Sequence, residues 1–234
     1  MKLMKLSLAA ALAATMGMAS DITSEIGVSA NVSMTSNYMW RGMSQTSNSP
    51  AIQGGFDLDY KGFYVGTWGS NVAGETPENS LTNYGEANME LDLYAGYSSE
   101  FAGIGYDIGF LQFVYPGNTK ESGWGEAYLG LSYDLEVVSV GAKYSYAIDT
   151  MDNGWDDQYN LLELSASVPL PYDMAIDGTY GFYENVGDYY YVGLTKSIKS
   201  YDFTLAYTGL TDSSVGSVEV SKEDKATFTV GTSF

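Results

Sequence analysis

Apolar and polar residues alternate one by one through the last eleven residues of the sequence. Ala226, Phe228 and Val230 share one parity with Phe234, and the other parity carries mostly Lys, Thr and Ser. A period of two is the pattern of a β-strand with one apolar and one polar face. An aromatic residue at the end of such a strand is typical of the interfacial girdle of a membrane barrel. A strand of a soluble β-sandwich explains this segment, taken alone, equally well.

The beginning of the sequence favours the barrel. Lys2 and Lys5 precede an apolar run over residues 6–18, and small residues surround Ala19. A charged region, a short apolar region and a small-x-small site are the parts of a secretory signal peptide. We therefore expect a signal peptide over residues 1–19 and an exported outer-membrane barrel over residues 20–234. The apolar run is too short to cross a bilayer as a helix.

The same alternation recurs along the rest of the chain, in about twelve segments. It is clearest over residues 87–95, where apolar residues alternate with Asn88, Glu90 and Asp92. Long connections follow the odd-numbered segments, the one after the ninth segment being the shortest of these, and short turns follow the even-numbered segments. Outer-membrane barrels have an even number of strands, long loops at one end and short turns at the other. The sequence thus predicts an all-β fold, a transmembrane antiparallel up-and-down β-barrel of about 12 strands in a Gram-negative outer membrane.

The first predicted strand is long and runs over residues 28–40. Its apolar parity closes with Tyr38 and Trp40, which we expect at the lipid interface. Arg41 falls on the inward parity. The polar connection over residues 42–49 is predicted to lie outside the barrel.

Acidic residues dominate the inward parity of the predicted strands. The acids are Asp57, Asp59, Glu86, Glu90, Asp92, Asp107, Glu126, Asp134, Glu163, Asp177 and Asp202, and the bases assigned to the same parity are Arg41, Lys61 and Lys143. An unpaired carboxylate is costly in a dry interior, so this excess predicts a water-filled lumen. Carboxylate-lined pores favour cations. The alternative is a narrow, plugged lumen that the acids merely keep polar.

Nine of these residues are our candidates for the lining that sets selectivity. They are Arg41, Asp57, Asp59, Glu86, Glu90, Asp92, Asp107, Glu126 and Glu163. Arg41 has two interpretations. It forms a constriction with acids such as Asp57, or it neutralises neighbouring acids and holds the first loop in place.

The composition excludes several kinds of site. The chain has no Cys and no His, which excludes thiol chemistry and catalytic pairs built on histidine. Its 10 basic and 29 acidic residues give a net charge of −19, so basic residues are too scarce to bind nucleic acid. The acids of residues 149–157 resemble a Ca²⁺ loop, but a polar Asn-Gly turn explains them better. We therefore expect no catalytic residues, no metal site and no cofactor.

One segment resembles the signature of a proteobacterial family. Its residues are Ser36-Asn37-Tyr38-Met39-Trp40-Arg41-Gly42, Ser44-Gln45-Thr46, Pro50-Ala51, Gln53-Gly54-Gly55, Asp57 and Gly66-Thr67-Trp68. They are similar to the signature of the Gcw-type conserved hypothetical proteins, also described as TorF-type porins. The resemblance implies an outer-membrane barrel. It transfers no catalytic residue to this chain and gives the Trp40-Arg41-Gly42 segment no role.

Together these observations predict a porin-like channel of the outer membrane for passive diffusion of small hydrophilic solutes or ions, with a preference for cations. Its expected partners are outer-membrane lipid, the permeating solutes or cations, and the barrel-assembly machinery, which would recognise Phe234. The alternative is a non-conducting outer-membrane barrel with a structural or adhesion role carried by acidic external loops.

Overall fold

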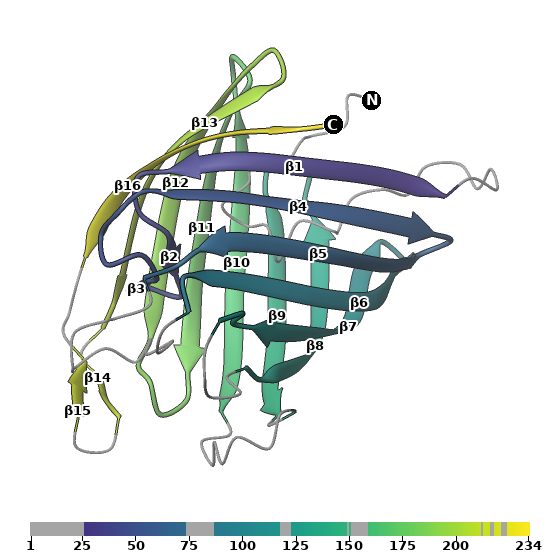
Figure 1. Ribbon diagram of the computed structural model, residues 1–234. Coiled ribbons are helices and arrows are strands. Elements are labelled where there is room, and N and C mark those ends of the chain that lie inside the picture. The colour runs from purple at the N-terminus through teal and green to yellow at the C-terminus, as the bar shows by residue number, and fades with distance from the viewer. Residues whose placement is uncertain are drawn as a thin grey trace.

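The structure is a computed structural model that describes residues 26–73, 87–117, 123–148, 150, 159–211, 213–215, 218–220 and 224–234. Twelve antiparallel strands close into one barrel (Figure 1). They are β1 (Gly27–Thr35), β4 (Ala51–Tyr60), β5 (Phe63–Asn71), β6 (Met89–Phe101), β7 (Ile104–Val114), β8 (Gly125–Asp134), β9 (Ser139–Ile148), β10 (Asn160–Leu170), β11 (Met174–Tyr183), β12 (Tyr189–Ile198), β13 (Tyr201–Leu210) and β16 (Lys225–Ser233). Two small hairpins, β2 (Met39–Trp40) with β3 (Met43–Ser44) and β14 (Ser213–Val215) with β15 (Val218–Val220), complete the fold. The predicted fold class is confirmed.

The first and last strands close the barrel. β1 pairs antiparallel with β4 on one side and with β16 on the other. Phe234 extends this last ladder, because its N–H donates to the carbonyl of Ala30 at 2.9 Å and its carbonyl accepts from the N–H of Ala30 at 3.3 Å. Closure leaves no strand edge unpaired, which is the condition for a sheet to cross a membrane. No helix in the described part of the chain is long and apolar enough to do so.

The outer face of the barrel is apolar, because successive side chains of a strand point to opposite faces. Large apolar residues that are exposed on it include Val28, Met34, Phe63, Val65, Leu93, Ile108, Leu129, Leu164, Val192 and Leu205. Such an outward apolar band is what the bilayer interior requires. Just before β6 the predicted alternation does not hold: Ala87, expected on the outer face, is buried, and Asn88, expected on the inner face, is exposed. Both residues precede β6, so the alternation of that strand does not extend to them.

The connections differ in length between the two ends of the barrel, as predicted. The turns at one end, which we call the short-turn end, cover residues 61–62, 102–103, 135–138, 171–173 and 199–200. The connections at the other end, the long-loop end, cover residues 36–50, 72–88, 115–124, 149–159, 184–188 and 211–224. The connection after β11 is the shortest at its end, again as predicted.

The first strand is shorter than predicted, and this is the main correction to the fold. β1 ends at Thr35, and the following residues fold into the barrel as the β2–β3 hairpin (Figure 1). Arg41 (φ 48°) and Gly42 (φ 80°) form its turn, and positive φ at both central residues is the mark of a two-residue type I′ turn. Tyr38 and Trp40 therefore lie inside the barrel and not at the lipid interface. Of the residues predicted as an external loop, 42–46 are likewise part of this inward segment, whereas 47–49 are exposed.

Aromatic residues fill the lumen around the hairpin. One buried cluster contains Tyr38, Ala51, Val72, Ala87, Leu111, Phe113 and Tyr115, with Trp40, Trp68 and Trp124 packed against it. A second contains Ala147, Tyr159, Leu161, Tyr183, Tyr189 and Leu210, with Met43 and Trp124 packed against it. Because Trp124 contacts both, the long-loop half of the lumen has a continuous apolar core.

Along the wall, inward tyrosines lie over inward glycines of the neighbouring strand. The directly opposed pairs are Tyr64 with Gly96, Tyr94 with Gly66, Tyr128 with Gly109, and Tyr189 with Gly181. A Cβ atom at Gly96 would lie 2.2 Å from the hydroxyl oxygen of Tyr64, and one at Gly66 would lie 2.4 Å from the ring of Tyr94. A ring that covers a glycine restores the contacts that the missing side chain would make. These positions need glycine because the rings occupy their side-chain space.

Candidate functional site

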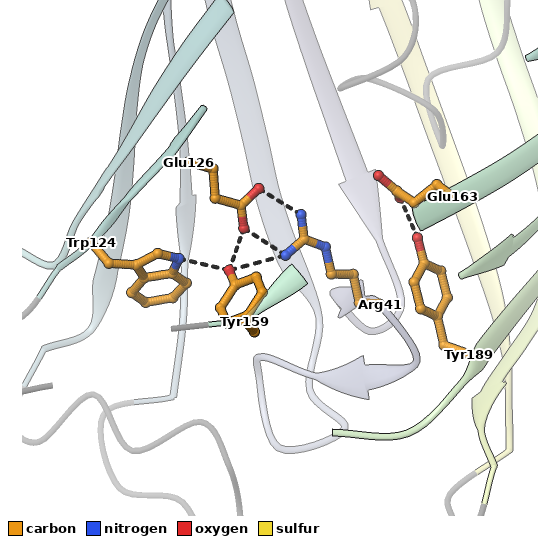
Figure 2. A network of polar contacts seen from close by, with 6 residues as sticks. All are labelled: Arg41, Trp124, Glu126, Tyr159, Glu163 and Tyr189. Atoms are coloured by element: carbon orange, nitrogen blue, oxygen red, sulfur yellow. Dashed lines mark hydrogen bonds and ion pairs between the residues drawn. The ribbon is translucent and has the colours of Figure 1, made fainter. Parts of the chain in front are cut away.

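The candidate site is the tip of the β2–β3 hairpin together with the lumen wall that receives it. Arg41 extends from the tip to Glu126 near the beginning of β8 (Figure 2). Its Nη1 lies 2.6 Å from Oε1 of Glu126 and its Nη2 lies 2.7 Å from Oε2. Both residues are buried, Glu126 completely. Two parallel bonds between a guanidinium and a carboxylate fix orientation as well as position.

Three wall residues complete the surroundings of the guanidinium. The hydroxyl of Tyr159 donates to Glu126 and accepts from Nη1 of Arg41 at 3.2 Å. The indole N–H of Trp124 donates to the same hydroxyl at 2.8 Å, which fixes Tyr159 in place (Figure 2). The ring of Tyr183 lies 5.4 Å from the guanidinium carbon. The carboxylate that binds Arg41 is thus itself held by the wall.

The hairpin supplies one more contact to its own arginine and a second anchor to the wall. The ring of Trp40 lies 4.2 Å from the guanidinium carbon of Arg41, within the range of a cation–π contact. The hydroxyl of Tyr38 donates to Oε1 of Glu90 on β6 at 2.7 Å. Backbone bonds tie down the rest of the segment: Gln45 donates to the carbonyl of Tyr38 at 2.7 Å and accepts from the N–H of Ala73 at 2.9 Å. The hairpin is therefore fastened to the wall on several sides.

Asp92 stands beside this network without a full set of partners. It is 2% exposed, and its Oδ1 has no hydrogen-bond partner among the described residues. Its direct cross-strand neighbours are Trp68 on β5 and Phe113 on β7. Arg41 is the nearby cation, and its guanidinium is already bound by Glu126. The region therefore holds more carboxyl groups than basic groups.

Tyrosine hydroxyls donate to many of the lumen carboxylates. Besides the bonds to Glu90 and Glu126, Tyr64 donates to Asp107 at 2.7 Å, Tyr94 to Asp57, and Tyr189 to Glu163. Tyrosine hydroxyls, and not lysine or arginine side chains, thus donate the hydrogen bonds to these carboxylates. The excess of acids is therefore not by itself a sign of a lumen full of water, because a hydrogen-bonded carboxylate is far less costly to bury than a free one.

The predicted lining residues fall into groups with different environments. Glu90, Asp92, Asp107 and Glu126 are buried, Asp57 and Glu163 are half-buried, and Asp59 is exposed near the short-turn end. Glu86 lies outside the described residues, as do most of residues 149–157. Arg41 pairs with Glu126, whereas Asp57 is bonded to Tyr94, so the geometry matches the interpretation in which Arg41 neutralises an acid and holds the first loop.

Sequence reasoning missed the aromatic members of the site and one basic residue. Tyr38 and Trp40 were assigned to the lipid face, and no role was given to Trp124 or Tyr159. Lys225, at the start of β16, shares the inward parity and was not counted among the bases. In the described part of the chain, no group of three or more Asp and Glu residues is arranged to hold a metal ion.

Solved structures with a similar fold are outer-membrane barrels. The KdgM porin superposes with a TM-score of 0.58 at 11% sequence identity, covering 88% of this chain and 98% of the porin. The same porin in complex with disordered oligogalacturonate gives a TM-score of 0.57 at 10% identity, covering 88% and 97% of the two chains. An active-site mutant of outer membrane phospholipase A from Escherichia coli gives 0.53 at 12% identity, covering 93% and 94%. At identities this low, the structural similarity establishes a shared fold and nothing about activity.

The sequence itself identifies a family. No curated protein matches the chain. The Gcw_chp family model, described as a bacterial protein of unknown function, matches residues 19–234. That range includes the whole barrel, the inward hairpin and the network around Arg41. The chain therefore belongs to the Gcw_chp family.

Proposed function

We propose that this protein is an outer-membrane channel for passive diffusion of small hydrophilic solutes and ions, and that it prefers cations. The observation that carries the proposal is a closed twelve-stranded barrel with an acidic inner face. Barrels of about eight strands are filled by side chains and those of about sixteen leave an open channel, so about twelve allows a narrow path. The inward hairpin narrows that path further, which restricts it to small solutes.

The charges at the short-turn end support the cation preference. Asp59 and Asp134 are exposed there, and Asp57 is half-buried slightly deeper in the barrel. Lys143 is on the inward parity too, but its ammonium lies 4.5 Å from the ring of Tyr128. Acids that reach water at the mouth of a low-dielectric tube raise the local concentration of cations. The oligogalacturonate described with the similar KdgM porin is an acidic sugar, and this lining would repel such a solute.

The alternative function is a barrel that conducts nothing and serves envelope structure or adhesion. The packing of the hairpin against Trp124 and Phe113 favours it, because this packing fills the long-loop half of the lumen. Under this alternative the Arg41–Glu126 pair is a permanent fastening. Under the channel proposal it is the narrowest part of a path.

Conductance of the refolded full-length protein in planar bilayers distinguishes the two functions. The channel proposal predicts discrete conductance steps. In a KCl gradient it predicts a reversal potential of the sign expected for a pore that is more permeable to K⁺ than to Cl⁻. Absence of current above background would support the non-conducting barrel. A reversal potential of the sign expected for a Cl⁻-selective pore would support a channel but contradict its cation preference.

We further propose that Phe234 is read by the barrel-assembly machinery. Phe234 is 78% exposed while its backbone is bonded to β1, so its side chain is accessible at the barrel surface. Replacing Phe234 with Asp should lower the amount of protein in the outer membrane. If the outer-membrane fraction contains a normal amount of the folded variant, judged by its heat-dependent migration on gels, then Phe234 is not needed for recognition by the assembly machinery.

A further inference from the structure

We infer that the wall around Arg41 is a binding site for the guanidinium group of a small organic cation, and that Arg41 occupies this site in the present structure. The inference rests on the proposed channel function and names a class of solute for it. Arg41 acts as a tethered substitute for that solute, which displaces it on the way through the barrel.

The site is made by the barrel and not by the hairpin. Glu126 belongs to β8, Tyr183 to β11, and Trp124 and Tyr159 directly precede β8 and β10. Glu126 and Tyr159 supply the hydrogen bonds to the guanidinium, and the Trp124 indole holds Tyr159. Glu126, Tyr159 and Trp124 bond to one another without help from the hairpin (Figure 2). A site whose groups are already held in position loses little freedom when a ligand binds.

The geometry matches a guanidinium better than a metal ion or a bulky ammonium ion. Two carboxylate oxygens, 2.6 and 2.7 Å from two different nitrogens, match the planar fork of a guanidinium. The tyrosine oxygen accepts a further bond, and the rings of Tyr183 and Tyr159 lie 5.4 and 5.8 Å from the guanidinium carbon. An alkali ion needs a shell of oxygens, and a tetramethylammonium ion cannot donate hydrogen bonds at all.

A second cationic group would be attracted to the neighbouring acids. Asp92 is close enough to Glu126 and Arg41 to interact with both electrostatically, and its buried Oδ1 has no partner among the described residues. Glu90, two residues earlier on the same strand, is bonded to Tyr38 of the hairpin. The displaced hairpin would therefore leave acids in excess over bases. This favours solutes that carry an amine as well as a guanidinium, and agmatine is a simple probe of this class.

Arg41 competes with such a solute because it is attached to the site. A group tethered through a short segment acts at an effective concentration of about millimolar or above. Removing the Arg41 side chain should therefore open the site to a free ligand. We expect agmatine to bind the Arg41→Ala protein on the order of tenfold or more tightly than the wild type, the scale of one bidentate charged pair.

The experiment is agmatine titration of the refolded barrel in detergent micelles, followed by tryptophan fluorescence and calorimetry at constant ionic strength. Trp124 lies in the site and reports its occupation. Arg41→Ala should bind agmatine, Arg41→Ala/Glu126→Gln should not, and tetramethylammonium or K⁺ should not compete. Lys196→Ala is the matched control, because it removes one positive charge from a strand outside the site and should leave binding as weak as in the wild type.

Equal binding to the wild type, Arg41→Ala and Lys196→Ala, or equal competition by tetramethylammonium, would overturn the inference. If Arg41→Ala fails to refold, agmatine added during refolding should restore the yield while the same concentration of KCl should not, and failure of that rescue would count against the site. The binding readout needs no current. A barrel that conducts but does not bind agmatine therefore rejects the binding site alone, whereas a barrel that binds agmatine but never conducts rejects the channel and retains the binding site.

Discussion

Glu126 and Asp134 are inward acids of the same strand, and they lie in very different surroundings. Glu126, at the long-loop end of β8, is completely buried and bound by Arg41 and Tyr159. Asp134, at the short-turn end, is exposed, and its Oδ1 accepts the N–H of Glu136 in the turn at 2.8 Å. Parity along a strand gives both residues the same face, but not the same role. We expect acids of the long-loop half to hold the hairpin, and acids of the short-turn end to act on passing ions.

The halves differ because only one end has connections long enough to fold inward. The turns at the short-turn end span a few residues and cannot reach into the lumen, whereas residues 36–46 enter it from the other end. The asymmetry of loop length therefore determines where the lumen is packed.

Removing the hairpin should have the largest effect. Thr35 and Ala51 are directly opposed in the β1–β4 ladder, so an Asn-Gly turn can replace residues 36–50 without changing the register. We expect single-channel conductance to rise several-fold, because the filling of the long-loop half is lost. Heat-modifiable migration on gels checks that the barrel still forms. Unchanged conductance in a folded variant would show that the hairpin does not lie in the path.

Breaking the Arg41–Glu126 pair should lower the free energy of unfolding more than removing the exposed acid at the other end of the same strand. Glu126→Ala leaves a buried guanidinium without its carboxylate, and breaking a buried pair in this way costs about 3–5 kcal/mol. Asp134→Ala on the same strand should cost about 1 kcal/mol, the value of one exposed turn hydrogen bond. Urea unfolding in micelles, followed by tryptophan fluorescence, measures both. Similar losses for the two variants would contradict the proposed difference between the halves.

A smaller effect should distinguish glycines beneath rings from glycines in open space. A Cβ at Gly96 would lie 2.2 Å from the hydroxyl oxygen of Tyr64, so Gly96→Ala should cost about 1–3 kcal/mol through overpacking. At Gly130 the nearest atom to an added Cβ is 3.7 Å away, on Asp107, and Gly130→Ala should be nearly neutral. The same urea titration compares the pair. An equal cost would mean that strand conformation, and not the tyrosine rings, selects glycine on this wall.

The sequence was sufficient to predict the barrel, because alternation and loop length are properties of neighbouring residues. It was insufficient for the hairpin for the same reason. Ser36, Tyr38 and Trp40 continue the parity of β1, so the alternation gives no sign that the strand ends at Thr35. The available sign was Gly42 in a short polar stretch, and its partner in the turn is Arg41, a residue seldom found at positive φ.

The polar contacts of the site could not be derived from local patterns at all. Tyr159 and Glu126 are far apart in sequence, as are Tyr38 and Glu90, and their contact depends on the register of the closed barrel and on the hairpin fold. The content of tyrosine is high, at 21 residues, and Tyr38 was expected at the lipid interface. Part of the tyrosine content instead supplies O–H donors to inward carboxylates, which a count of charges alone misses.

The smallest expected effect concerns ion selectivity at the short-turn end. Asp57→Asn/Asp59→Asn removes two charges and retains a carbonyl acceptor for Tyr94, so the barrel should stay folded. One charge acting through water at about 4 Å is worth about 1 kcal/mol, which limits the fall in the K⁺ to Cl⁻ permeability ratio to about fivefold per charge. The effect should shrink as salt rises, because screening acts over about 10 Å at 0.1 M and about 3 Å at 1 M. Reversal potentials in KCl gradients at two mean concentrations measure both trends.

Glu90→Gln/Asp92→Asn is the matched pair from the buried half, and it should move the reversal potential less, because these carboxylates are covered by the hairpin. If that pair moves it more, then permeating ions meet Glu90 and Asp92 directly, and the hairpin must leave the lumen whenever the channel conducts.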